Sequence, residues 1–194
     1  YAWIQHMIHH LAPNGKIGLV LANGALSTQS SGEGEIRKRI IEDDLIEGIV
    51  AMPTQLFYSV TIPVTLWLIT KNKKQKGKTL FIDARKMGFM VDRKHRDLSD
   101  EDIAKLADTF TAFQNGELKE VNGFCAVATT EEIAKQDYIL TPGRYVGIEE
   151  QEDDGEPFDE KMKRLTSELS KMFAKSHEFE NEIREKLGAI GYEV

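Results

Sequence analysis

The first 85 residues show two kinds of apolar spacing, which predict helices alternating with strands. Apolar residues three and four apart predict an amphipathic helix over 1–12 and a second one over 35–44. In the second helix the isoleucines are expected to face inward, and Arg37, Lys38 and Arg39 outward. Short apolar runs predict strands over 16–22, 45–52, 64–70 and 79–84.

The same runs predict how the strands assemble. The first two are nearly continuous, a pattern typical of strands covered on both faces. Pro63 directly precedes the third strand, where its missing N–H is tolerated. Because only a short polar loop joins the third and fourth strands, we expect them to pair antiparallel. The order of elements predicts an α/β fold with an antiparallel edge.

Residues 86–148 predict a smaller α+β segment. Ser99 is expected to cap a helix that ends near Asn115, and Thr130 is expected to cap a shorter one. A short strand is expected over 124–128. The predicted organisation is therefore a sheet-forming part over 1–85, this peripheral segment over 86–148, and a tail over 149–194.

The tail predicts an acidic linker and one long, coiled-coil-like helix. Apolar residues recur from 158 to 190 at mostly alternating spacings of four and three, over about 45 Å at roughly 1.5 Å per residue. Ser176 interrupts this apolar seam, which suits a different partner better than a self-paired zipper. The alternative is that the helix folds back on its own domain. The expected partner contacts are Phe158, Met162, Leu165, Leu169, Met172, Phe179 and Ile183.

Charge separates the tail from the rest. Residues 149–194 hold 14 acidic and 7 basic side chains, whereas residues 1–148 hold 18 of each, so the net charge of −7 belongs to the tail. The neutral part still contains a basic stretch, interpreted either as a solvated loop and linker or as a surface for DNA phosphates. Its candidates are Lys71, Lys73, Lys74, Lys76 and Arg85, with Lys78, Lys86, Arg93, Lys94 and Arg96 nearby.

Other signals exclude several classes of protein. The single Cys125 excludes an intrachain disulfide and fits a reducing compartment. His6 and His10 have the spacing of a zinc pair but lack the glutamate of the HExxH motif, so no metal site is predicted. The sequence contains no phosphate-binding P-loop and no GxGxxG. No apolar run reaches the roughly 18 residues that a membrane span needs.

A series of segments resembles a known family. In order along the chain they are 11–26, 34–42, 45–53, 55–58, 61–71, 81–85 and 140–147. Together they resemble the N6-adenine DNA methyltransferases that serve as modification subunits of type I restriction–modification systems. The resemblance implies the C-terminal half of a Rossmann-like methyltransferase sheet with an antiparallel edge, followed by a long C-terminal helix.

The resemblance also implies a reaction, in which a methyl group passes from S-adenosylmethionine to adenine N6 in duplex DNA. The target base must leave the stack to be reached. The family's Asn-Pro-Pro-Phe/Tyr motif and Gly-rich cofactor loop are absent from this sequence and are expected upstream of Tyr1. We therefore assign no catalytic or cofactor-binding residue, and we expect this piece to be inactive alone and to bind no cofactor.

A second set of expectations concerns the DNA and the partners. The rim of the substrate pocket is assigned to Asn23, Gly24, Phe57, Thr61, Ile62 and Pro63. The alternative is that Asn23 and Gly24 form only a turn and that Phe57 is only core. The implied partners are the specificity and restriction subunits and duplex DNA, in the cytoplasm. Self-association is expected through the exposed sheet edge or the tail helix.

Overall fold

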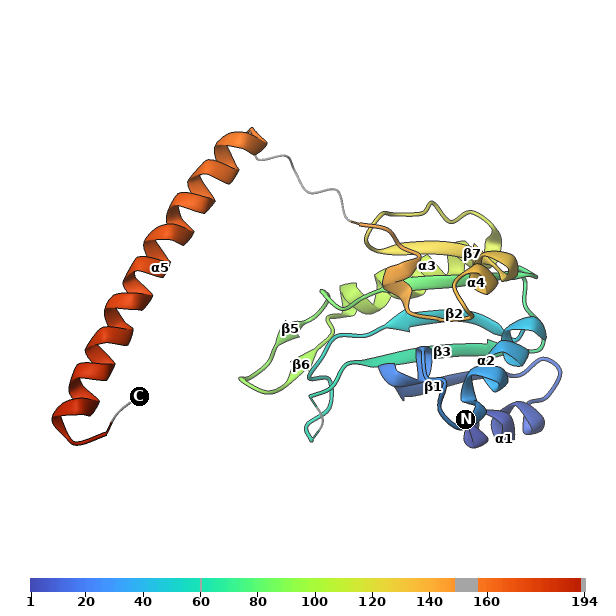
Figure 1. Cartoon of the computed structure of the whole chain (residues 1–194). Coiled ribbons are helices and arrows are strands. Elements are labelled where there is room, and N and C mark those ends of the chain that lie inside the picture. The colour runs from blue at the N-terminus through green and yellow to red at the C-terminus, as the bar shows by residue number, and fades with distance from the viewer. Residues whose placement is uncertain (60, 149–156, 193–194) are drawn as a thin grey trace. The chain divides into compact units, whose positions relative to one another are not determined.

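The computed structural model describes residues 1–59, 61–148 and 157–192 (Figure 1). The chain divides into two compact units, Tyr1–Glu150 and Gln151–Val194. The first unit is built on a mixed sheet of five strands in the order β1-β3-β2-β4-β7. These strands are β1 (Lys16–Ala22), β2 (Ile46–Ala51), β3 (Val64–Thr70), β4 (Lys78–Asp83) and β7 (Cys125–Thr129).

The strand directions bring several chain segments to one edge of the sheet. β3 is antiparallel to both β1 and β2, β2 is parallel to β4, and β4 is antiparallel to β7. Ala22, the last residue of β1, pairs with Val64, and Ala51, the last of β2, pairs with both Thr65 and Asp83. The ends of β1, β2 and β4 therefore meet the starts of β3 and β7. We call this the carboxyl edge.

The predicted pairing of the third and fourth strands is wrong, because β2 lies between β3 and β4. Asp44, in the turn before β2, explains why the chain crosses from β3 to the other side of β2. Its two carboxylate oxygens accept hydrogen bonds from the backbone N–H of Gly77 (2.9 Å) and from Nζ of Lys73 (2.5 Å). The loop 71–77 is thus held across the start of β2 and delivers β4 to its far side.

Helices cover the two faces of the sheet unequally. On one face lie α1 (Ala2–His10), α2 (Glu33–Glu42) and α4 (Thr130–Lys135), which share a core with Trp67 and Phe81. On the other lies α3 (Asp100–Asn115), which packs its buried Phe113 against Leu80 and Ile82. The alternation of Leu80, Phe81 and Ile82 between the two cores follows the period of two along a strand.

Burial confirms the prediction for β2 and corrects it for β1. Every residue of β2 is buried, as its nearly continuous apolar run predicts, and the burial includes Glu47. Along β1 burial alternates, so that Ile17, Leu19 and Leu21 pack on the core while Val20 is 47% exposed. β1 is the outer strand of the sheet in the described chain, and the apolar side chains that pack with α3 come from β2, β3, β4 and β7, whereas β1 contributes only Lys16, over the Phe110 ring.

The predicted helices are confirmed, with corrections at single residues. Ser99 caps α3 through a reciprocal capping box with Asp102, and Gly116 ends the helix with a positive φ of 76°. The cap of α4 is Thr129 rather than Thr130. Arg37 does not face outward: it is fully buried and donates from Nε to the Tyr138 carbonyl oxygen and from Nη1 to that of Thr28.

The peripheral segment joins the same fold. It contributes β7 to the main sheet and also a short hairpin of β5 (Phe89–Met90) and β6 (Arg96–Asp97). Short 3₁₀ turns complete the unit at η1 (Asn23–Leu26), η2 (Ser30–Gly32) and η3 (Pro142–Arg144). The proposed domain boundary at residue 85 stays a prediction.

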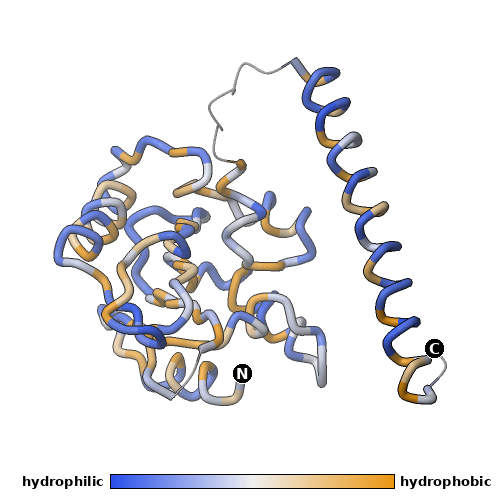
Figure 2. The backbone as a smooth tube through the Cα atoms, turned by 90° about the vertical axis from the view of Figure 1, so that its left-hand side faces the viewer, coloured by the Kyte–Doolittle hydropathy of each residue, from blue (hydrophilic) through white to orange (hydrophobic). Residues whose placement is uncertain are grey.

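The second unit is described from residue 157 to 192. It consists of α5 (Phe158–Ala189), a helix of 32 residues, which confirms the predicted long helix. Apolar positions recur along it between hydrophilic ones (Figure 2), and none of its residues is buried. The predicted acidic linker, 149–156, lies outside the described residues. In the described part of the chain no helix is long and apolar enough to cross a membrane.

Candidate functional site at the carboxyl edge

The carboxyl edge brings the two halves of the predicted pocket rim together. Asn23 and Gly24 follow β1 directly, and Thr61, Ile62 and Pro63 precede β3, its antiparallel neighbour. Within the described residues the Asn23 side-chain oxygen Oδ1 is buried and accepts no hydrogen bond. A buried carbonyl oxygen without a donor is costly, so this atom is suited to accept one from a bound molecule.

Phe57 lies in the loop between β2 and β3 and is 45% exposed, so its alternative interpretation as core does not hold. Tyr58 and Ile62 are also exposed, at 86% and 53%. The loop is anchored by the backbone N–H of Arg96, which donates to the Gln55 carbonyl oxygen at 2.8 Å. This loop therefore presents three exposed apolar or aromatic side chains at the carboxyl edge.

Sequence reasoning missed the partner of this loop. The ring of Tyr58 stacks on that of His95, with centroids 4.2 Å apart and planes 12° apart. His95 belongs to the β5–β6 hairpin, which projects from the carboxyl edge beyond the ends of the strands (Figure 1). The adjacent aromatic residues Phe57 and Tyr58 were the available signal, but nothing in the sequence indicated His95.

The basic candidates do not form one continuous surface. Lys71, Lys74 and Lys76 lie in the β3–β4 loop, at the opposite edge of the sheet from Arg85. The six residues of β4 separate the two edges by roughly 20 Å at about 3.3 Å per residue. Lys73 is buried against Asp44, which removes it from any exposed basic surface.

Arg85 lies at the carboxyl edge but is already engaged. Its Nε and Nη2 donate to the two carboxylate oxygens of Asp83 at 2.9 and 2.6 Å. Burial tends to raise the pKa of Asp83, but these hydrogen bonds outweigh it and hold the pKa below its ordinary value. Asp83 is therefore a charged structural partner, and Arg85 is a poor candidate for binding phosphate.

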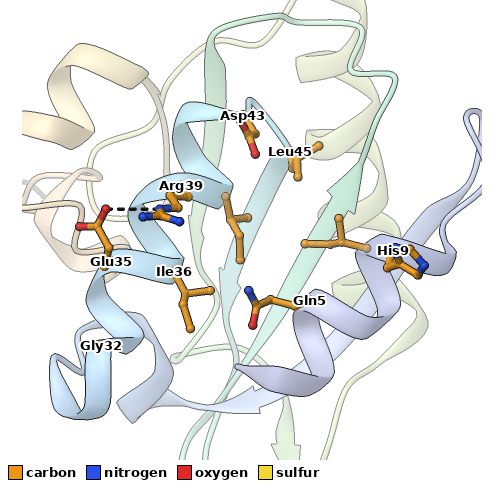
Figure 3. Close-up of a pocket in the computed structure, with 10 residues that line it drawn as sticks. Gln5, His9, Gly32, Glu35, Ile36, Arg39, Asp43 and Leu45 are labelled. Atoms are coloured by element: carbon orange, nitrogen blue, oxygen red, sulfur yellow. Dashed lines mark hydrogen bonds and ion pairs between the residues drawn. The ribbon is translucent and has the colours of Figure 1, made fainter.

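Two hollows of about 560 Å³ lie on the surface of the first unit. One lies beside Asp83 and Asp102, where both carboxylates are committed, Asp83 to Arg85 and Asp102 to the α3 cap. The other is a groove between α1 and α2 (Figure 3), lined by Ile36 and Ile40 and by the Glu35–Arg39 ion pair. Among the described residues no three His, Cys, Asp or Glu gather as metal ligands.

The comparisons with known proteins decide the family. Residues 1–154 match the family model described as N-6 DNA Methylase. This chain belongs to the N-6 DNA methylase family. The matched residues include the whole mixed sheet and the carboxyl edge.

Within this family the chain is similar to methylase subunits of type I restriction enzymes. The chain is 56% identical over its whole length to the type I restriction enzyme HindI methylase subunit of Haemophilus influenzae. It is 50% identical over 99% of its length to the MjaIX methylase subunit of Methanocaldococcus jannaschii. It spans 44% and 35% of the lengths of these relatives.

A solved structure agrees with the fold. The type I restriction-modification system methyltransferase subunit from Streptococcus thermophilus superposes with a TM-score of 0.68 at 29% identity. The superposition covers 76% of this chain and 30% of that one. The predicted α/β fold of Rossmann-like methyltransferase type, with its C-terminal helix, is thereby confirmed.

Proposed function

We propose that this chain is part of the modification subunit of a type I restriction–modification system, and that the complete subunit methylates adenine N6 in duplex DNA. The observation that carries the proposal is the convergence of Asn23 with residues 61–63 at the carboxyl edge of a sheet that the family model matches. In open α/β sheets ligands bind outside the carboxyl ends of the strands.

In this proposal the carboxyl edge forms one rim of the pocket that receives the flipped adenine. Phe57 and Ile62 supply exposed apolar surface against which an unstacked base can lie. Asn23 supplies an unsatisfied acceptor, Oδ1, for an amino group. Gly24, Thr61 and Pro63 shape the two turns that hold these side chains in place.

The methyl donor implied by the family is S-adenosylmethionine, and the residues of this chain do not fit a complete site for it. β1 leads into η1, β2 into the Pro53 loop and β4 into the β5–β6 hairpin, so no Gly-rich turn runs from these strands into a helix. The Asn-Pro-Pro motif is also absent from the 194 residues. We therefore expect the chain to be inactive alone, with other residues of the subunit completing the donor site.

Calorimetric titration tests this division of labour. S-adenosylmethionine is titrated into this chain and into the full-length subunit under the same conditions. We expect heat of binding only with the full-length subunit. Saturable binding to the 194-residue chain would show that it contains a donor site, and absence of binding and methylation in the full-length subunit would refute the methyltransferase assignment.

A second candidate role is assembly through α5. Its apolar residues are exposed along the whole helix, from Phe158 at 75% to Ile183 at 56%. We propose that this seam docks the specificity subunit, in a cytoplasmic complex that also includes the restriction subunit. Light scattering on a chain ending at Glu150, with and without the specificity subunit, tests the idea, and an unchanged assembly state would count against it. The outer edge of β1 is the competing surface for self-association.

A further inference from the structure

The β5–β6 hairpin is built as a fixed projection. Phe89 pairs with Asp97 and Met90 with Arg96, and the turn is closed by the Val91 N–H donating to the His95 carbonyl oxygen. Gly88, at a φ of 81°, starts the hairpin where a Cβ would lie 2.5 Å from the Asp97 carbonyl oxygen. The start of the hairpin therefore requires glycine, and its tip has a defined position.

The hairpin is tied to the candidate base pocket. The Arg96 guanidinium donates from Nη1 to the Met87 and Gly88 carbonyl oxygens at 3.0 and 3.3 Å. The Arg96 N–H and the Tyr58–His95 stack then join the hairpin to the loop that carries Phe57. These contacts join the hairpin to Gln55 and Tyr58, which flank Phe57 of the predicted pocket rim.

The tip of the hairpin carries two adjacent cations, Arg93 and Lys94. Both are exposed, and in the described residues neither side chain has a carboxylate partner. In the described residues Asp92 forms no ion pair with either side chain. Its Oδ1 accepts the backbone N–H groups of Lys94 and His95 at 2.7 and 2.8 Å, and its charge acts on Lys94 only through space. These hydrogen bonds lower the pKa of Asp92 and keep its carboxylate turned into the loop. Arg93 and Lys94 thus differ from Arg85 and Lys73, which are both paired with carboxylates.

We propose that Arg93 and Lys94 bind phosphates of the DNA backbone beside the target adenine, with the Tyr58–His95 stack fixing the distance between this contact and the base pocket. The inference rests on the proposed function, because it takes the adjoining rim as the place of the flipped base. Duplex DNA is the proposed ligand because the tip is cationic and the Tyr58–His95 stack joins it to the loop of that rim. Contacts to phosphate position a protein on the duplex without reading its sequence.

The salt dependence of DNA binding tests the phosphate contact. The full-length subunit, assembled with its specificity subunit, is titrated with a duplex containing the recognised site at several salt concentrations. If two phosphate contacts are lost, Arg93→Ala/Lys94→Ala should reduce the slope of log K against log salt by about 1.8, at about 0.9 per phosphate. Lys38→Ala/Arg39→Ala removes the same charge from α2, at two positions that are not among the basic candidates for DNA, and should keep the slope.

Each outcome of this comparison decides the proposal. A slope that is unchanged in Arg93→Ala/Lys94→Ala, or that falls equally in both variants, would overturn it, since the second result reflects net charge alone. Methylation by the unsubstituted complex is measured in parallel. If that complex methylates DNA but the tip variant keeps its slope, only the hairpin contact fails. If that complex does not methylate DNA, the proposed function itself fails.

A separate kinetic experiment tests the positioning role of the Tyr58–His95 stack. Tyr58→Phe keeps the stacked ring, whereas Tyr58→Ala removes it. We expect Tyr58→Ala to raise the KM for DNA several-fold with little change in kcat, and Tyr58→Phe to behave like the unsubstituted protein. Equal KM values for all three proteins would refute the positioning role, and a loss of kcat alone would instead place Tyr58 at the reacting base.

Discussion

Arg37 shows how one residue can join distant parts of the chain. Its guanidinium is fully buried and holds two carbonyl oxygens, those of Thr28 before α2 and Tyr138 after α4. The charge pattern predicted an outward side chain, because Arg37 begins a run of three basic residues. The sequence around Arg37 does not indicate that the segment containing Tyr138, 101 positions away, covers this face of α2.

Replacing Arg37 should therefore lower the free energy of unfolding far more than replacing Arg39, two positions along the same helix. Arg37→Met leaves both carbonyl oxygens buried without their donors, so we expect the free energy of unfolding to fall by about 3 kcal/mol. Arg39→Met, whose side chain is 74% exposed and pairs only with Glu35, should change it by less than about 0.5 kcal/mol.

Urea unfolding can measure both changes through Trp67, which is fully buried. Trp3, the other tryptophan, is 76% exposed, so a Trp3→Phe background isolates the core signal. Equal losses in the two arginine variants would show that the buried hydrogen bonds contribute nothing specific.

Tyr145 makes a pH-dependent contribution to the free energy of unfolding. Its ring stacks on Phe81 at 3.9 Å and its hydroxyl donates to the Ile139 carbonyl oxygen, and burial raises its pKa to about 12. Because the folded state holds this proton more tightly, the contribution is present below pH 10 and is lost as pH rises through about 12. We expect absorbance titration at 295 nm to show a late-ionising tyrosine that Tyr145→Phe removes. An unchanged late phase in that variant would assign it to another tyrosine.

At the scale of single elements, local chemistry was sufficient for the helices and insufficient for the sheet. Helix ends are set by residues within four positions of each other, so Ser99, Gly116 and the 3–4 apolar spacing predicted α3 well. Strand order depends on contacts between distant residues. The Asp44 contacts with Lys73 and Gly77 place β2 between β3 and β4, and no pattern within either strand records them.

The two capping boxes offer a matched pair of substitutions. Ser99 caps α3, which has 16 residues, and Thr129 caps α4, which has six. Ser99→Ala and Thr129→Ala each remove a side-chain acceptor from an N-terminal N–H and should each cost about 1 kcal/mol. Urea unfolding of both variants checks this expectation, with Thr111→Ala, an exposed position within α3, as a control that should cost less. Losses no larger than the control would show that the caps are dispensable.

At the scale of the whole molecule, the resemblance located the family and the carboxyl edge, but the site could be only partly anticipated. Asn23 and Phe57 were predicted at the rim, and the register of β1 and β3 gives their segments a common edge. The basic residues were predicted as one group because they are close in sequence. A strand carries the chain from one edge to the other within a few residues, which is why Lys74 and Arg85 are separated.

The division into two compact units leads to a prediction about unfolding. The first unit buries its core between the sheet and helices α1 to α4, whereas α5 has no buried residue of its own. A helix without a packed face is only marginally stable in water. In urea unfolding of the 194-residue chain we therefore expect helicity, followed by circular dichroism, to be lost before Trp67 fluorescence changes. In a chain ending at Glu150 the two transitions should coincide, at the same Trp67 midpoint as in the longer chain. A lower Trp67 midpoint in the shorter chain would instead show that the tail stabilises the first unit, as the folded-back alternative requires.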